Sequence, residues 1–173
     1  PFTFYRGAPA VMAYDLAQTP ASGIVVQLCG DCHISNFGLF GSPERSMVFD
    51  LNDFDETLPG PFDWDVKRAA ASIVVAARNA RLSDKVARAA VAQTVQVYRT
   101  KMAEFATASY LGVWYSHTTS SMVLEMAEKR ERKAIQGRMA RVQTKDRLAA
   151  FAKLTEVVDG ERRIVHNPPL LIR

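Results

Sequence analysis

Few cysteines and no long apolar run occur in this chain, and each absence excludes a class of protein. With only two cysteines, a zinc site built from two cysteine pairs is excluded. No apolar run approaches the roughly 20 residues that span a bilayer. Residues 1–6 also lack the basic and then apolar layout of a signal peptide. We therefore expect a cytoplasmic protein without a membrane span.

Compositional bias is lacking as well. Hydrophobic residues make up 48% of the chain and charged residues 23%, which excludes the disordered and fibrous classes and predicts a soluble globular protein. A chain of 173 residues fits one domain and can bury roughly 70% of the surface that its unfolded form exposes. The first residue is not Met and the end shows no terminating feature, so we expect a piece of a longer protein.

Charge is unevenly distributed along the chain. Residues 31–65 contain eight acids and one base, Arg45, whereas residues 125–147 contain eight bases and four acids. Clustered carboxylates repel one another unless cations, partner bases or water compensate them, so the acidic stretch indicates a metal site. The basic stretch has two interpretations, contact with phosphates or the solvated face of a helix.

The first third of the chain predicts short strands that lead into acidic residues. A helix is expected over residues 11–17, and the β-branched run at residues 23–28 predicts a buried strand. A second short strand is expected at residues 46–49, after a turn at residues 41–44.

After residue 61 the pattern changes to helices and ends in a hairpin. The expected helices cover residues 64–79, 84–108 with Ser83 as N-cap, 120–141 with a break at Gly137, and 145–154 with Thr144 as cap. Asp159-Gly160 accepts the positive φ of a tight turn between residues 156–158 and 162–165. The sequence thus predicts an α+β fold in a single partial domain, with a β and loop segment at 1–60, helices at 61–155 and a hairpin at 156–166.

The stretch richest in reactive groups is residues 29–38, Cys-Gly-Asp-Cys-His-Ile-Ser-Asn-Phe-Gly, followed by residues 47–56. Asp31 and Asn36 lie on a loop after the first strand, and an acid run beginning at Asp50 follows the next strand. Phosphoryl transfer uses one carboxylate to orient the acceptor hydroxyl, and an amide oxygen and a second carboxylate to hold Mg²⁺. All three group types occur in this order, which favours phosphoryl transfer.

Other interpretations of the two cysteines stay open. Cys29, Cys32 and His33 match the short pattern for covalent haem attachment. The two thiols could also supply half a zinc site, for which only His117 and His166 remain as distant ligands. The simplest alternative is that two small thiols pack beside the end of a strand.

Two more alternatives concern the acidic residues. Asp31 and His33 resemble the start of a dinuclear metallophosphoesterase site, although that class of site needs further histidine ligands. Asn and Asp at turns can also serve only to satisfy backbone groups, and Gly30 and Gly38 can serve only tight backbone geometry.

A resemblance to a known catalytic loop adds specific roles. Residues 30–36, Gly-Asp-Cys-His-Ile-Ser-Asn, resemble the Gly-Asp-x-His-x-x-Asn loop of aminoglycoside phosphotransferase-type, kinase-like enzymes. The resemblance implies that Asp31 is the catalytic base and Asn36 a metal ligand. It also implies that Gly30 and His33 support the loop.

The same resemblance extends to later residues. The metal-binding aspartate after the next strand maps onto Asp50, with Asp53 as its rival. Residues 60–65 look like the segment in which these enzymes place a structural aspartate at the start of a helix, here Asp65. Arg6 and Arg68 are expected to pair with the acidic residues, with contact to a phosphate as the alternative, and Arg68 is expected to support the loop.

Residues 5–7, 29–38, 49–56 and 60–68 together resemble a bacterial family called domain of unknown function 2252. This resemblance implies a kinase-like fold in which the Gly-rich, Lys-bearing nucleotide lobe follows the catalytic segment. No Gly-rich phosphate loop and no Val-Ala-x-Lys strand occurs before Arg173. We therefore expect the nucleotide-binding lobe to be absent from this chain.

The sequence and the resemblance together predict the catalytic segment of a kinase-like phosphotransferase. Mg²⁺ and ATP are implied by the resemblance, and the acceptor is an unidentified small molecule or protein. One alternative is a kinase-shaped binding module without catalysis, whose basic helix at residues 130–147 contacts nucleic acid or an acidic partner. The other is a metal-dependent phosphoesterase. No membrane partner is expected.

Overall fold

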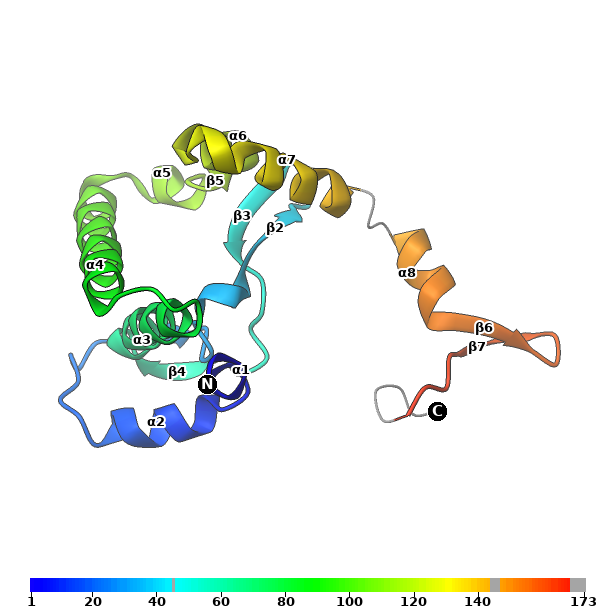
Figure 1. Ribbon diagram of the computed structural model, residues 1–173, viewed down its shortest axis with the longest axis horizontal. Coiled ribbons are helices and arrows are strands. Elements are labelled where there is room, and N and C mark those ends of the chain that lie inside the picture. Colours follow the sequence, from blue (N-terminus) through cyan, green and yellow to red (C-terminus); the bar gives the residue numbers. More distant parts are fainter. Residues whose placement is uncertain (45, 144–146, 169–173) are drawn as a thin grey trace. The chain divides into compact units, whose positions relative to one another are not determined.

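The chain folds as a mixture of helices and short strands, so the predicted α+β class is confirmed. The computed structural model describes residues 1–44, 46–143 and 147–168 (Figure 1). The sequence predicts one domain, and the structure divides into two compact units, Pro1–Phe40 with Val48–Thr118, and Gly41–Met47 with Thr119–Arg173. None of the described helices combines the length and the apolar character needed to cross a membrane.

The first unit carries all the residues that the sequence assigns to a site. Its elements, in chain order, are α1 (Phe2–Arg6), α2 (Pro9–Ala17), β1 (Val25–Leu28), η1 (Ile34–Asn36), β4 (Leu58–Pro61), α3 (Asp63–Asn79), α4 (Asp84–Thr107) and α5 (Tyr110–Trp114). Three strands have an end residue assigned to the second unit: β2 (Phe37–Gly41), β3 (Met47–Leu51) and β5 (Thr118–Thr119).

β1 is the strand expected at residues 23–28, and it pairs antiparallel with β4, so that Leu28 faces Leu58. The expectation that it is buried along its length is wrong. Val25 is 65% exposed, whereas Leu28 is 2% exposed. A two-stranded sheet covers little of its own faces, so only the end of β1, where the reactive loop begins, lies in the core.

β3 confirms the strand expected at residues 46–49. Its neighbour β2 was not predicted, and the two strands lie in a sheet of order β2-β3-β5. Phe37 on β2 and Phe49 on β3 stack with ring centroids 6.4 Å apart. Two glycines, Gly38 and Gly41, lower the strand propensity of β2, which is why the sequence pattern missed it.

Helices α3 and α4 pack against each other (Figure 1) and confirm the two long helices expected there. Ser83 is the N-cap of α4, since its side chain accepts a hydrogen bond from the Val86 amide. Small side chains on both helices, Ala77 and Ala87, are buried and allow the helices to approach closely.

One face of α3 meets the reactive loop. Asp65, Arg68 and Ser72 are spaced three and four positions apart, so they lie on the same side of the helix. Contacts join α3 to α1, α2 and η1. The helix that follows β4 therefore supports the loop that follows β1.

The second unit contains α6 (Ser120–Met126), α7 (Lys129–Gln143), α8 (Arg147–Leu154), β6 (Thr155–Val158) and β7 (Glu161–Ile164). The predicted hairpin is confirmed, because β6 and β7 pair antiparallel. Asp159 and Gly160 have φ angles of 54° and 81°, as a tight turn of this kind requires. The predicted cap Thr144 lies outside the described residues.

The helix expected over residues 120–141 is two helices, and the predicted break at Gly137 is wrong. The break lies at Ala127, whose ψ of 142° is extended. Arg132 Nε donates to the freed Ala127 carbonyl at 3.1 Å, and the Glu128 carbonyl accepts from the amides that open α7. Local hydrogen bonds therefore decide the break, while a glycine inside a helix costs only about 1 kcal/mol.

Candidate functional site

A short loop, residues 29–33, leaves the buried end of β1 and carries Asp31. Gly30 in this loop has a φ of +87°, and a Cβ at this position would lie 2.0 Å from the Glu56 carbonyl oxygen. Both the positive φ and the close approach require glycine. The loop therefore lies directly against the segment that precedes β4.

Asp65, in the first turn of α3, binds the backbone of this loop. Its Oδ2 accepts from the Cys29 amide at 2.7 Å, and its Oδ1 accepts from the Gly30 amide at 3.1 Å. Backbone N–H groups removed from water need acceptors, and a carboxylate is a strong one. Asp65 thereby fixes the loop to the start of α3.

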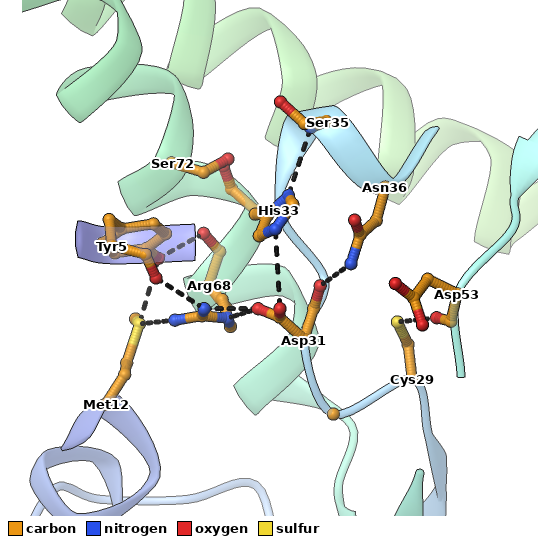
Figure 2. Close-up of polar contacts among 12 residues, drawn as sticks. Tyr5, Met12, Cys29, Asp31, His33, Ser35, Asn36, Asp53, Arg68 and Ser72 are labelled. Carbon is orange, nitrogen blue, oxygen red and sulfur yellow. Dashed lines mark hydrogen bonds and ion pairs between the residues drawn. The ribbon is translucent and has the colours of Figure 1, made fainter. Parts of the chain in front are cut away.

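The central contact of the site is a buried ion pair between Asp31 and Arg68 (Figure 2). Arg68 Nε and Nη2 both contact Asp31 Oδ1. The two residues are 6% and 3% exposed. Removing two charges from water is costly, and the pair is stable only when further hydrogen bonds complete it.

Those further contacts come from α1 and α2. Arg68 Nη2 donates to the Tyr5 carbonyl at 2.9 Å, and Nη1 lies 3.5 Å from Met12 Sδ. The guanidinium carbon is 4.5 Å from the Tyr5 ring centroid, a cation–π distance. The Tyr5 hydroxyl donates to the Arg68 carbonyl at 2.7 Å, and burial raises the pKa of this hydroxyl, which keeps it a donor.

His33 supports Asp31 from another direction. Its Nδ1 accepts from the Ser35 amide at 3.2 Å, and its Nε2 lies 3.5 Å from Asp31 Oδ2. Because Nδ1 accepts a hydrogen bond, the ring proton is on Nε2 and points at the carboxylate. Ser72 on α3 accepts from the Ile34 amide at 3.0 Å, which holds the next residue of the loop.

Asn36 is oriented by the same loop. Its Nδ2 donates to the Asp31 carbonyl at 2.9 Å, and the residue is buried. Since the amide nitrogen is engaged with the backbone, the amide oxygen is the atom that Asn36 offers as a ligand. Figure 2 shows the Asn36 and Asp53 side chains on neighbouring segments.

Two hydrogen bonds join this loop to the one after β3. The Asn52 amide donates to the Asn36 carbonyl at 3.0 Å, and the Cys29 thiol donates to the Asp53 carbonyl at 3.4 Å. The Asn52 side chain lies over Gly38, so that a Cβ at Gly38 would come 2.5 Å from Asn52 Nδ2 and would displace that side chain. Asp53 is therefore held beside Asn36.

A polar pocket of about 390 Å³ opens where these loops meet α1. Its lining combines three carboxylates, an amide, an imidazole and one guanidinium: Thr3, Arg6, Gly7, Asp31, His33, Asn36, Asp53 and Glu56. This pocket is the candidate functional site. It brings together Asp31, Asn36 and Asp53, which the sequence assigns to one site.

Asp50 is placed differently from Asp53. It is exposed on β3, its Oδ1 accepts from the Leu51 amide at 2.8 Å, and it is not among the described residues that line the pocket. The geometry therefore favours Asp53 as the carboxylate that faces Asn36, although spacing in the sequence favours Asp50. The strand continues to Leu51, so the loop begins later than expected.

Histidine is scarce at the pocket. Within the described part of the chain, His33 is the one histidine in the lining, and neither His117 nor His166 joins it. The cysteines likewise gather with Asp65 and without a histidine. These placements give no support to a histidine-rich dinuclear site or to a zinc site completed by the two distant histidines.

Several residues that support the site were not identified from the sequence. Tyr5 and Met12 hold Arg68, Ser72 holds the loop, and Glu56 lines the pocket. The spacing of Ser72 from Arg68 on α3 is the one signal that could have indicated its role. The contacts from α1 and α2 join residues 56 to 63 positions apart, and no local pattern encodes them.

The fold and the pocket define an α+β protein with a carboxylate-lined site built on two adjacent loops. A family model described as "Uncharacterized protein conserved in bacteria (DUF2252)" matches residues 1–173. The chain belongs to this bacterial family. No curated protein and no solved structure matches the chain significantly.

The first testable consequence concerns the buried ion pair. Arg68→Ala should lower the free energy of unfolding by about 3–5 kcal/mol, because it leaves the buried Asp31 carboxylate without its cation. Urea unfolding followed by circular dichroism measures the change.

The matched control is Arg78→Ala on the same helix. Arg78 pairs with Asp84 at 3.2 Å, but the two side chains are 64% and 57% exposed, so its loss should cost less than about 1 kcal/mol. Equal losses for the two variants would contradict the assignment of a stabilising role to the buried pair.

A second consequence concerns the contact at Gly30. Gly30→Ala should destabilise the protein by more than about 2 kcal/mol, because alanine resists the positive φ and its Cβ meets the Glu56 carbonyl. Gly41→Ala is the control, since a Cβ there has no neighbour within 4 Å, and should change stability by less than about 0.5 kcal/mol. Thermal unfolding of both variants checks this, and a stable Gly30→Ala would disprove the close contact.

Proposed function

We propose that this chain carries the catalytic pocket of a Mg²⁺-dependent phosphotransferase of the kinase-like type. The observation that supports this most is the shared pocket of Asp31, Asn36 and Asp53. One carboxylate to orient a hydroxyl, together with an amide oxygen and a second carboxylate to hold Mg²⁺, is the set of groups that phosphoryl transfer needs.

The residues present fit a magnesium ion. Mg²⁺ prefers oxygen ligands, and in phosphate sites it is held by one or two protein groups together with substrate phosphates and water. The Asn36 amide oxygen and the Asp53 carboxylate would hold it here. A bound Mg²⁺ would neutralise the phosphate charge that develops during transfer.

Asp31 is suited to orient the acceptor. Arg68 holds Oδ1, and His33 Nε2 lies beside Oδ2, so the carboxylate keeps one orientation. A carboxylate fixed in this way can accept a hydrogen bond from the acceptor hydroxyl and take its proton during transfer. In this proposal Arg68 and His33 are positioning residues.

Arg6 supplies the cationic group of the pocket. It is the last residue of α1 and lines the pocket together with Asp31, Asp53 and Glu56, and no ion pair to Arg6 is found among the described residues. A guanidinium is well matched to phosphate oxygens. We assign Arg6 to contact a phosphate group of the substrate.

The resemblance of residues 30–36 to a kinase-like loop supports the same function. Asp65 binds the amides of Cys29 and Gly30, as expected of a structural aspartate that supports such a loop. The proposal takes ATP as phosphate donor from that resemblance. The acceptor is a hydroxyl-bearing small molecule or protein.

The metal assignment distinguishes Asp53 from Asp50. In a protein extended past Arg173 to include the nucleotide-binding lobe, Asp53→Asn should weaken Mn²⁺ binding in the presence of ATP by about tenfold or more, since a lost contact of about 1.4 kcal/mol is a factor of ten. Asp50→Asn should leave it unchanged, because Asp50 lies outside the pocket lining. Electron paramagnetic resonance of free Mn²⁺ measures the affinity, and the reverse pattern would assign the metal to Asp50.

Turnover tests the proposal as a whole. In the same protein extended past Arg173 to include the nucleotide-binding lobe, Asp31→Asn should lower the rate of ATP turnover by about 10²–10⁴-fold with little change in KM for ATP, because the group acts on the acceptor. Unfolding curves of the same variant separate this from the loss of the buried ion pair. Unchanged turnover would rule out Asp31 as base, and hydrolysis of a simple phosphate ester with Mn²⁺ and without ATP would indicate a phosphoesterase instead.

The Arg6 assignment predicts a binding defect rather than a folding defect. Arg6→Gln should raise KM for the phosphate-bearing substrate about tenfold, an effect that weakens as salt rises, and should leave the unfolding free energy within about 0.5 kcal/mol. Arg88→Gln, an exposed change on α4, is the control. Equal KM for both variants would contradict a phosphate contact by Arg6.

A further inference from the structure

We propose that Cys29, Cys32 and Asp65 form a binding site for a thiophilic divalent cation such as Zn²⁺. One sulfur from each cysteine and one carboxylate oxygen lie within 4.8 Å of one another. Both cysteines are free thiols and buried, at 3% and 6% exposure. This inference does not depend on the phosphotransferase proposal.

The ligand types and spacing suit zinc. Zn²⁺ takes cysteine sulfur at about 2.3 Å and aspartate oxygen at about 2.0–2.2 Å, so sulfurs at two corners of a tetrahedron lie about 3.8 Å apart. Atoms already within 4.8 Å therefore need shifts of about 1 Å to close around the ion. Soft thiolates also select Zn²⁺ over Mg²⁺.

A bound cation would offset the cost of deprotonating the buried thiols. Burial raises the pKa of the Cys32 thiol to about 12, and the charge of Asp65 adds to the effect. Burial also raises the pKa of Cys29. Burial opposes a thiolate that stands alone, whereas a bound cation would compensate the charges of both thiolates and of Asp65 together.

Asp65 retains capacity for a metal although it accepts two backbone hydrogen bonds. A carboxylate has about four lone-pair sites, and the Cys29 and Gly30 amides occupy two of them. Those bonds also fix the orientation of the carboxylate, as partners of metal ligands commonly do. The chain thus provides three ligands, and water completes the fourth position.

A bound cation would clamp the loop that carries Asp31. Cys29 and Cys32 lie on either side of Asp31 in the sequence, and Asp65 belongs to α3. Closure of this site would therefore join the loop to the helix by metal bonds. The pair Asn36 and Asp53, made of hard oxygen ligands, would remain a separate site.

The test is a titration of the reduced protein with Cd²⁺, in a phosphine reductant that contributes no thiol. We expect one Cd²⁺ per chain, a sulfur-to-metal charge-transfer absorption and the release of about two protons per ion, because both thiols are protonated before binding. Zn²⁺ should compete for the same site and remove the Cd²⁺ charge-transfer absorption as it displaces the Cd²⁺.

Variants locate the site. Cys29→Ser and Cys32→Ser should each weaken Cd²⁺ binding by about tenfold or more, while Asp53→Asn should retain the absorption, since its carboxylate belongs to the other site. The Cd²⁺ absorption of the unaltered protein and its displacement by Zn²⁺ give an answer even where a variant folds poorly.

Three results would overturn the proposal. The first is the absence of a charge-transfer band when Cd²⁺ is added. The second is a band that is lost in Asp53→Asn but retained in Asp65→Asn. The third is a mass lower by two hydrogens, which would show that Cys29 and Cys32 form a disulfide in place of a metal complex.

Discussion

The buried ion pair between Asp31 and Arg68 is the constraint on which the site depends. Two charges at 6% and 3% exposure are tolerated only when each is compensated, and the structure supplies that compensation from three helices. Tyr5 and Met12 come from α1 and α2, and Arg68 itself from α3. The pair therefore organises the first unit around one carboxylate, and the loop, the helices and the pocket lining follow from where that carboxylate is held.

The second loop is attached to the first by backbone contacts. The Asn52 amide binds the Asn36 carbonyl, and the Cys29 thiol binds the Asp53 carbonyl. Both bonds end on backbone carbonyls, so they hold the second loop without using the Asp53 carboxylate, and Asp53 lines the pocket. The Asn36 and Asp53 side chains thus line the pocket, whereas the sulfurs of Cys29 and Cys32 lie within 4.8 Å of a carboxylate oxygen of Asp65 on α3.

Sequence patterns predicted much of the fold and part of the site. Periodicity and capping indicated α3, α4 and the last hairpin, because Ser83 and Asp159-Gly160 act through local geometry. The pattern failed at β2, where glycines weaken the strand signal, and at the break between α6 and α7. It also favoured Asp50, because spacing along a chain does not reveal that β3 continues to Leu51.

The sequence by itself determined which groups are available, namely the acids, amide, thiols and bases of residues 29–68, and the local turns that expose them. The tertiary structure alone decided which of these groups meet. Arg68 reaches Asp31 across 37 positions, and Asp65 reaches Cys29 across 36. Such contacts arise from the packing of α3 beneath the loop, and packing of this kind depends on the whole unit rather than on any short pattern.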